Sequence, residues 1–480
     1  MLKLSYLVAF VPIILVCATA VTVMLGIAWR RQHAVTAIVT VVGLNLALVT
    51  AWLVGQAAII TTPLLVFDDL TLFASVLILT ATLACATFCH VYLEGYPGAK
   101  EEFYLLMLCA AAGGLVLVAS RHLATLFLGL ELLSMPLYGM LAYTFRDRRS
   151  LESGIKYLVL SAAATAFLLF GMALLYAQTG RLDLSGLISG LTASTGVWGL
   201  AGAGLMLVGL GFKLSIVPFH LWTPDVYEGG PGPAATFLAT ASKVAVFVVV
   251  LRLMLAAPVF QERWLHDVLT TLALLTMLVG NLLALLQSNL KRLLGYSSIA
   301  HFGYLLVALV VGTGLAVETA CLYLVTYMIT TLGAFGVVTL LSSPYTGEDA
   351  SALHHYRGLF WRRPYLAAVL TVCLLSLAGI PFTAGFIGKF YIIALGVDAQ
   401  RWWLVGGIIL GSVVGLYYYL RVLVTLYLVE PGMRRRDATN DWGLRAGGLV
   451  VIGLALLVLL MGVYPSPVIE WAEAMVIAVL

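Results

Sequence analysis

The sequence predicts an all-α polytopic membrane protein, and three features of the 480-residue chain lead to this fold class. First, 62% of the residues are hydrophobic and only 10% are charged, whereas soluble domains are about 45–50% apolar and about 25% charged. Second, the apolar residues gather in runs of about 20, the length of a membrane-spanning helix. Third, a few charges lie inside these runs, where each costs roughly 3 kcal/mol.

The apolar runs, bounded by turn or charge signals, predict about fourteen transmembrane helices. The first run is too long for the core of a signal peptide and is followed by Arg30 and Arg31, so we interpret it as a span. No loop between the runs is long enough for a soluble domain. The runs lie near residues 4–29, 34–54, 70–93, 103–119, 122–145, 153–178, 197–217, 233–256, 265–286, 293–312, 316–342, 365–395, 402–429 and 444–464.

Lysine and arginine are unevenly divided between alternate loops, which predicts the orientation in the membrane. One set of loops contains Arg30, Arg31, Lys100, Arg146, Arg148, Arg149, Lys291, Arg292, Arg357, Arg362, Arg363, Arg434, Arg435, Arg436 and Arg445. The other set, with the chain ends, contains Lys3, Arg121, Arg181, Arg263 and Arg401. We expect the rich side to be cytoplasmic, and both termini to lie in the periplasm because the number of spans is even. The net charge of +4 is small and does not suggest a nucleic-acid partner.

Two spans are interrupted by glycine and proline in a similar way. The seventh contains GLGFKLSIVPFHLW and the twelfth contains SLAGIPFTAGFIGKFYIIALG. Such a pair at corresponding positions is typical of transporters built from inverted repeats, with broken helices at the binding site. We therefore predict two inverted five-helix repeats at 101–258 (helices 4–8) and 259–430 (helices 9–13). Residues 1–100 would hold scaffold helices 1–3, and 431–480 would hold helix 14 and a tail.

Four charged residues inside the predicted spans are the main site candidates: Glu131, Lys213, Lys243 and Lys389. Burial disfavours the charged form of a lysine, and a nearby carboxylate favours it, so a buried lysine between these influences can exchange protons. Intramembrane charges are functional by default, which predicts a proton relay. Glu131 would be a proton carrier or the counter-ion of a buried lysine. The structural alternative is that Glu131 forms an ion pair that only fixes helix packing.

Four further residues are weaker candidates for the relay or for proton uptake: Lys156, His220, His301 and Glu102. Lys156 lies close enough to the end of its span for its side chain to reach the interface. Histidines titrate near neutral pH, although a lone histidine is more often a packing residue. Glu102 lies at a helix start, where interaction with the helix dipole also explains it.

The sequence indicates no metal site and no cofactor in this chain. Cys85, Cys89 and His90 share one helix end, but no CxxC pair or second ligand pair accompanies them. GLGFK lacks the spacing of a phosphate-binding loop, and its glycines are explained by close helix packing.

Three segments resemble the antiporter-like membrane subunits of proton-pumping NADH:quinone oxidoreductase, respiratory complex I. They are GLGFKLSIVPFHLWTPDVYEGGPGP, KRLLGYSSIAHFGYLLVAL and SLAGIPFTAGFIGKFYIIAL. The resemblance covers nearly the whole chain and is greatest to the bacterial N-type subunits. In M-type subunits the position of Lys389 is a glutamate, and L-type subunits carry an additional lateral helix.

The resemblance implies fourteen helices and a proton channel that uses Glu131, Lys213, Lys243 and Lys389. It also implies a bacterial inner-membrane location, other membrane-arm subunits as partners, and flavin, iron–sulfur clusters and quinone in other subunits of the complex. NADH oxidation and quinone reduction would then occur outside this chain. Two alternatives remain open at this point: a cation/proton antiporter subunit of the Mrp type, and a structural module that only closes the membrane arm.

Overall fold

Long apolar helices make up almost the entire chain, as the sequence predicts. The structure is a computed structural model that describes residues 4–54, 59–94, 96–193, 196–256, 263–342, 349–429 and 446–479. Within these residues, thirteen helices are long and apolar enough to cross a membrane. The predicted twelfth span adds a further, broken crossing, because it is divided into two helices of 15 residues each. The all-α polytopic fold is therefore confirmed, whereas the division into inverted repeats stays a prediction.

The helices and strands have the following bounds. The first half contains α1 Leu4–Trp29, α2 His33–Val54, β1 Ile60–Thr61, β2 Val66–Phe67, α3 Asp69–Leu93, α4 Glu101–Val118, α5 Leu123–Leu141, α6 Arg148–Thr179, α7 Leu184–Ala193, α8 Val197–Leu214, α9 Trp222–Gly229, α10 Gly232–Phe237, the π-helix η1 Leu238–Ser242 and α11 Lys243–Ala256. The second half contains α12 Arg263–Leu285, α13 Leu290–Val311, α14 Gly314–Leu341, the 3-10 helix η3 Leu353–Tyr356, α15 Leu359–Arg362, α16 Pro364–Ala378, α17 Ala384–Asp398, α18 Trp402–Tyr427, α19 Ala446–Val463 and α20 Ser466–Val479.

Side chains and glycines at the helix ends explain several of these bounds. Asp68, Asp147 and Asn289 each accept a hydrogen bond from a backbone N–H in the first turn of α3, α6 and α13. Gly180 and Gly312 end α6 and α13 in the left-handed conformation that glycine adopts without strain. The one sheet among the described residues is the pair β1–β2, which is antiparallel with Ile60 opposite Phe67.

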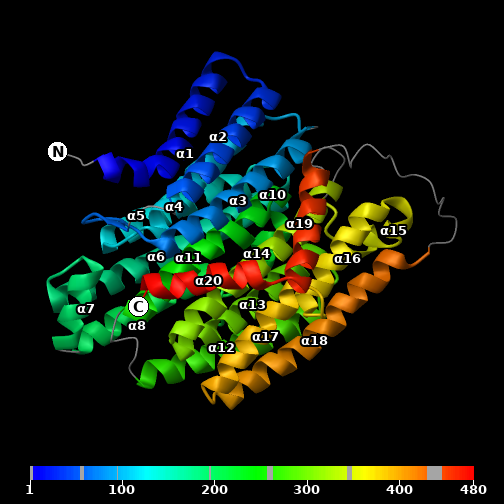
Figure 1. Ribbon diagram of the computed structural model, residues 1–480. Coiled ribbons are helices and arrows are strands. Elements are labelled where there is room, and N and C mark those ends of the chain that lie inside the picture. Colours follow the sequence, from blue (N-terminus) through cyan, green and yellow to red (C-terminus); the bar gives the residue numbers. More distant parts are fainter. Residues whose placement is uncertain are drawn as a thin grey trace.

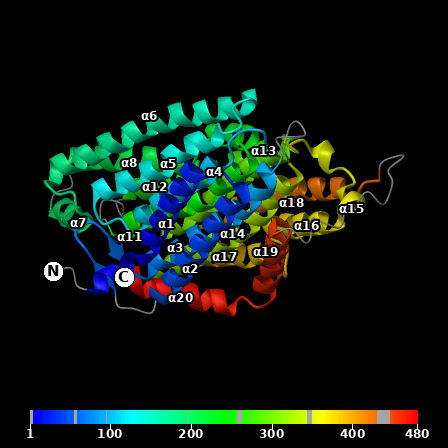
Figure 2. The same ribbon diagram turned by 90° about the horizontal axis from the view of Figure 1, so that it is seen from above.

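The core of the bundle lies in α13, α14 and the helix formed by α10, η1 and α11. Every residue in the most apolar window of 232–254 is buried, against 28% for that of α1. Helices α1, α2, α6, α12 and α18 lie at the outside of the bundle (Figures 1 and 2). The buried helices carry Lys243 and His301, and α8 and α17 bring Lys213 and Lys389 against them.

The C-terminal helix α20 was not expected from the sequence, which predicted only a tail after helix 14. It turns away from α19 after Pro465 and crosses the outside of α14 and α3 (Figure 1). The ring of Trp471 in α20 packs against Phe73 in α3 with a centroid distance of 4.6 Å. Seen from above, α20 follows one edge of the bundle (Figure 2).

Candidate functional site: a series of buried lysines

Lys213 lies in the last turn of α8, where the helix is broken. The helix ends at Leu214, earlier than the predicted span, because Ser215 adopts a left-handed φ of 64° and returns its N–H to Phe212 and Gly211. Lys213 is 4% exposed. Its Nζ donates to the Oγ of Ser134 in α5 at 2.6 Å and to the Oγ of Ser161 in α6 at 2.7 Å. Neutral hydroxyl groups therefore satisfy the amine where an apolar helix interior could not.

Glu131 lies one helical turn from Ser134, on α5. Its Oε1 accepts a hydrogen bond of 2.8 Å from the hydroxyl of Thr165 in α6, one turn beyond Ser161. No ion pair joins Glu131 to Lys213 within the part of the chain that the structure describes. The predicted counter-ion thus lies on α5 together with Ser134, and hydroxyl groups of α5 and α6 bind the two charged side chains in place of a direct ion pair.

Lys243 follows the π-helix η1 in the most buried helix of the fold. Its side chain is 0% exposed. Nζ donates to Ser298 Oγ in α13 at 2.8 Å, and this hydroxyl lies 2.6 Å from the hydroxyl of Tyr327 in α14. The Tyr327 hydroxyl in turn donates to the carbonyl of Ala239, inside the π-helix, at 3.1 Å. Short π-helices inside α-helices occur frequently at functional sites because they redirect side chains and free backbone groups.

His301 lies one turn beyond Ser298 on α13 and is also buried. Its Nδ1 is 2.6 Å from the hydroxyl of Tyr323, and its Nε2 is 3.3 Å from the hydroxyl of Tyr419 in α18. The ring centroids of His301 and Tyr327 are 5.6 Å apart, as are those of His301 and Tyr304. The structure therefore places His301 beside Tyr327, a partner of Ser298 and thus of the group that binds Lys243; its role in a relay stays a prediction.

Lys389 lies at the second helix break, on α17. Its Nζ donates to the carbonyl of Ala378, the last residue of α16, at 2.9 Å, and lies 5.6 Å from the ring centroid of Tyr304. Gly379 follows with a φ of 84°, and a Cβ atom there would lie 2.7 Å from Cδ of Lys389. The break thus needs a glycine both for its backbone conformation and for the space that the lysine stem occupies.

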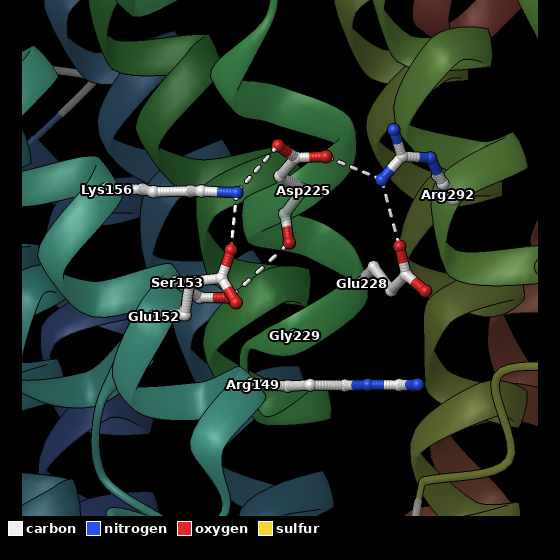
Figure 3. A pocket seen from close by; sticks show the side chains of 8 residues that line it. All are labelled: Arg149, Glu152, Ser153, Lys156, Asp225, Glu228, Gly229 and Arg292. Atoms are coloured by element: carbon white, nitrogen blue, oxygen red, sulfur yellow. Dashed lines mark hydrogen bonds and ion pairs between the residues drawn. The ribbon is translucent and has the colours of Figure 1, made fainter.

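Lys156 belongs to a separate cluster of charges, shown in Figure 3 around a pocket of about 190 Å³. Its Nζ contacts Glu152 at 2.6 Å and Asp225 at 3.1 Å. Asp225 also accepts from Arg292 Nη1 at 2.5 Å, and the same nitrogen contacts Glu228 at 3.0 Å. Burial alone would raise the pKa of Asp225, but the hydrogen bonds from Arg292 and Lys156 outweigh it and hold this pKa below its ordinary value.

The remaining two candidates are not hydrogen-bonded to the buried lysines. His220 is 6% exposed, and neither ring nitrogen has a hydrogen-bond partner among the described residues. Glu102 contacts Arg31 through Oε1 at 2.6 Å. This contact joins the start of α4 to the turn between α1 and α2, so the structure gives Glu102 a connecting role between helices.

Sequence reasoning missed the hydroxyl groups that hold the lysines, because serine, threonine and tyrosine are ordinary in membrane helices. The signal that could have found them is spacing: Ser134 follows Glu131 and Ser298 precedes His301 by one helical turn.

Sequence reasoning also placed Lys291 in a loop, which is wrong. Lys291 is fully buried in the first turn of α13, where it donates to the carbonyl of Gly230 at 2.7 Å and to Asp349 at 2.8 Å. Counting positive charges between apolar runs uses composition alone, so it does not distinguish a lysine in a loop from one buried in the first turn of a helix.

A metal ion has no cluster of three or more potential ligands among the described residues. Cys85 and Cys89 are buried free thiols within α3. The described site therefore consists of amines, hydroxyls, one carboxylate and one imidazole, groups that bind and exchange protons.

The chain is similar in sequence to a known family and to named proteins. The profile of the family described as "NADH:quinone oxidoreductase/Mrp antiporter, TM" matches residues 120–415. A protein of Chromohalobacter salexigens named NADH-quinone oxidoreductase subunit N is 72% identical over 98% of this chain and 100% of its own length. A protein of the same name from Ectopseudomonas mendocina is 59% identical over 97% of this chain and 96% of its own.

Solved structures show the same fold. A chain of respiratory complex I from Thermus thermophilus with bound aureothin superposes with a TM-score of 0.82 at 33% identity, covering 96% of this chain and 99% of that one. A chain of an archaeal membrane-bound sulfane sulfur reductase gives a TM-score of 0.87 at 23% identity, covering 98% and 97%. A chain of the Mrp complex from Dietzia sp. gives 0.84 at 19% identity, with the same coverage. At these lower identities the last two likenesses concern the fold alone.

The fold and the buried lysines at two helix breaks define the class, a polytopic membrane protein of the antiporter-like type. The chain belongs to the NADH:quinone oxidoreductase/Mrp antiporter family, and within that family to the subunit N group of the NADH-quinone oxidoreductases. The resemblance noted in the sequence is thereby confirmed.

Proposed function

We propose that this chain is the subunit of a bacterial NADH:quinone oxidoreductase that moves protons across the membrane through Glu131, Lys213, Lys243 and Lys389. The full-length relatives named NADH-quinone oxidoreductase subunit N favour this function over that of an Mrp-type antiporter subunit. The chain is a multi-pass membrane subunit of a respiratory complex, with other membrane-arm subunits as its partners. We place it in the inner membrane with both termini in the periplasm, on the basis of the loop charges.

The observation that carries the proposal is that three buried lysines are bound by neutral groups only. Lys213 and Lys243 donate to serine hydroxyls, and Lys389 donates to a backbone carbonyl. No ion pair to any of these lysines occurs among the described residues. A full positive charge on all three would be costly at bilayer depth. The series therefore favours holding few protons at once and passing them on.

Glu131 is the group that controls the first lysine in this mechanism. When the carboxylate approaches Lys213, it favours the ammonium form, and when Thr165 holds it away, the ammonium form becomes less favourable. Separation of the pair therefore drives the proton of Lys213 towards Lys243 and then Lys389. The proton leaves on the periplasmic side, and reloading from the cytoplasm completes the cycle.

The redox reactions lie outside this chain in the proposal. Flavin, iron–sulfur clusters and quinone belong to other subunits, and their energy reaches Glu131 and Lys213 as an electrostatic or conformational change. This chain then acts as a translocase: it exchanges and moves protons and undergoes no oxidation or reduction itself.

The test is Lys243→Ala in the assembled complex, with proton pumping per NADH measured in reconstituted vesicles. We expect pumping through this chain to be lost, because the described partners of Lys243 are hydroxyl groups, which cannot take up a proton as its amine does. Normal pumping per NADH in a fully assembled variant complex would refute the relay. Sodium/proton exchange by the complex without NADH would favour the Mrp-type alternative instead.

A further inference from the structure

Three buried aromatic rings lie between Lys213 and Lys243. The Nζ of Lys213 is 5.4 Å from the ring centroid of Tyr157 in α6. The ring of Tyr157 lies 4.9 Å from that of Trp222, which lies 6.4 Å from that of Tyr227. The Nζ of Lys243 is 6.0 Å from the centroid of Tyr227. We call Tyr157, Trp222 and Tyr227 the aromatic stack.

Trp222, the middle member of the aromatic stack, separates the polar groups around the two lysines. Tyr157, Trp222 and Tyr227 are 1%, 2% and 0% exposed. The hydrogen bonds of the described residues do not connect Lys213 to Lys243: those of Lys213 lead to α5 and α6, and those of Lys243 lead to α13 and α14. Tyr157 and Tyr227 carry hydroxyl groups that lie towards Ser134 and Ser298, but the indole of Trp222 between them presents no free hydrogen-bonding group. Hydrophobic constrictions of this kind close membrane pathways by excluding water.

Trp222, the middle ring, is tied to the helix break that carries Lys213. Its Nε1, the one polar atom of the side chain, donates to the carbonyl of Phe212 at 3.0 Å, and the two rings lie 5.3 Å apart. Phe212 immediately precedes Lys213 in the last turn of α8. The position of Trp222 therefore follows the position of the backbone beside Lys213.

We propose that the aromatic stack is a dry gate between Lys213 and Lys243, and that Trp222 opens it when the broken end of α8 moves. With the three rings in contact the gate is closed, and it excludes water from the space between the lysines. Displacement of the Phe212 carbonyl, which accompanies any shift of the last turn of α8, draws the indole out of the stack and admits water between the lysines. The gate rests on the proposed relay and adds to it a means of preventing protons from flowing back.

Passive proton flux tests the gate separately from the relay. The assembled complex is reconstituted in liposomes, a pH gradient is imposed without NADH, and its decay is followed with an internal pH dye. In Trp222→Ala we expect the flux per complex to rise about tenfold, equivalent to ~1.4 kcal/mol of lowered barrier. The double variant Trp222→Ala/Lys243→Ala should return the flux to the wild-type level, because the leak uses Lys243.

Two further variants keep the test decisive. Trp471→Ala is the matched control: it removes a tryptophan that packs on Phe73 of α3 and, among the described residues, has no ring contact with the aromatic stack, and it should leave the flux unchanged. Trp222→Phe keeps a ring and removes only the N–H that binds the Phe212 carbonyl, so it serves where the alanine variant does not assemble. We expect it to raise the flux about fivefold, equivalent to the ~1 kcal/mol that one hydrogen bond contributes.

The outcomes separate the two proposals. A wild-type flux in the assembled Trp222 variants overturns the gate, and so does a leak that persists in the double variant. Normal NADH-driven pumping by Lys243→Ala alone overturns the relay. If Lys243→Ala loses pumping while the passive proton flux of Trp222→Ala stays at the wild-type level, the relay is supported and the gate is refuted.

Discussion

The interval from Lys213 to Lys243 and the interval from Lys243 to Lys389 are built from different side chains. The first interval is crossed by the aromatic stack, with Trp222 in the middle turning its only polar atom to a backbone carbonyl. The second contains hydroxyl and imidazole groups at successive positions: Ser298, Tyr327, His301, Tyr323 and Tyr304. Trp222 thus interrupts the polar groups of the first interval, and under the proposed gate protons would be held back there and conducted in the second interval.

The two helix breaks also differ in the groups that bind their lysines. At the first break, side chains from α5 and α6 hold Lys213, and a carboxylate on α5 lies close by. At the second break, the backbone carbonyl of Ala378 holds Lys389. We expect the side chains around Lys213 to rearrange more readily than the backbone carbonyl that holds Lys389, so that the charge on Lys213 responds more strongly to its surroundings. The following changes test this division, from the largest expected effect on pumping to the smallest.

Gly379→Ala should damage the second break most severely. The left-handed φ of 84° costs a non-glycine residue about 1–2 kcal/mol. The added Cβ also lies 2.7 Å from Cδ of Lys389 and displaces the amine from the Ala378 carbonyl. We expect proton flux through this chain to fall by about tenfold, as the loss of a charge-assisted hydrogen bond predicts. Pumping per NADH in reconstituted complex measures it.

Gly406→Ala is the control for this change. Gly406 lies in α18, where a Cβ would meet no atom within 4 Å. Equal pumping by the two glycine variants would show that Lys389 does not depend on the geometry of the break.

His301→Phe should interrupt the second interval while keeping a ring of similar shape. It removes both ring nitrogens and leaves the hydroxyl of Tyr323 without its 2.6 Å partner. With a hydrogen bond contributing about 1 kcal/mol, we expect a several-fold loss of proton flux with normal assembly. A stopped-flow record of vesicle acidification gives the rate. Wild-type flux would remove His301 from the conducting interval.

Ser161→Ala and Thr165→Val act on the surroundings of Lys213 with opposite signs. The alanine removes one of the two hydroxyls that hold Lys213, and we expect a twofold to threefold loss of flux, about 0.5 kcal/mol, since Ser134 remains. The valine removes the donor to Glu131 and frees the carboxylate to approach Lys213, which favours the ammonium form. As the pH rises, pumping should then decline at a higher pH in Thr165→Val than in Ser161→Ala. The same pH profile for both variants would contradict the separation of the two charges.

Asp68→Asn lies outside both intervals and should change stability while leaving pumping intact. Asp68 accepts two hydrogen bonds from Arg252, at 2.5 and 2.9 Å, which tie the start of α3 to α11. Burial would raise the pKa of Asp68, but the Arg252 guanidinium outweighs it and holds the pKa below its usual range. Breaking such a buried pair costs about 3 kcal/mol.

The stability difference between wild type and Asp68→Asn should therefore depend on pH. A carboxylate whose pKa is lowered by folding stabilises the protein above its unfolded pKa of about 3.9, and this stabilisation is lost as the pH falls through the folded value. Thermal unfolding in detergent should show a constant gap between pH 7 and pH 5 and a narrowing gap below about pH 4. A difference in unfolding temperature that is the same at every pH would show that the Asp68–Arg252 ion pair does not stabilise the contact between α3 and α11.

The sequence analysis selected the candidate residues whose burial is costly and missed the hydroxyl groups that bind them. Lys213, Lys243 and Lys389 stand out because a charge in an apolar run is rare, and the glycine and proline residues around two of them mark the helix breaks. Ser161, which holds Lys213, has no such mark. Trp222 was equally inconspicuous, because only the tertiary structure shows which ring lies between two amines.

The span boundaries were predicted well where the polarity changes sharply and less well elsewhere. The run at 365–395 corresponds to α16 and α17, but its break at Gly379 was predicted only as an interruption. The run at 197–217 was extended beyond the true end of α8, because Ile216 and Val217 are apolar while the left-handed turn at Ser215 leaves no compositional trace.

The shared carboxylate of Asp225 has a mechanical consequence. Through Lys156 and Arg292 it joins α6, α9 and α13 (Figure 3). The side chains are partly exposed, so each ion pair contributes about 0–1 kcal/mol. Because both cations share one carboxylate, a displacement of α6 or of α13 strains an ion pair to α9, and the three helices are mechanically coupled through a single side chain.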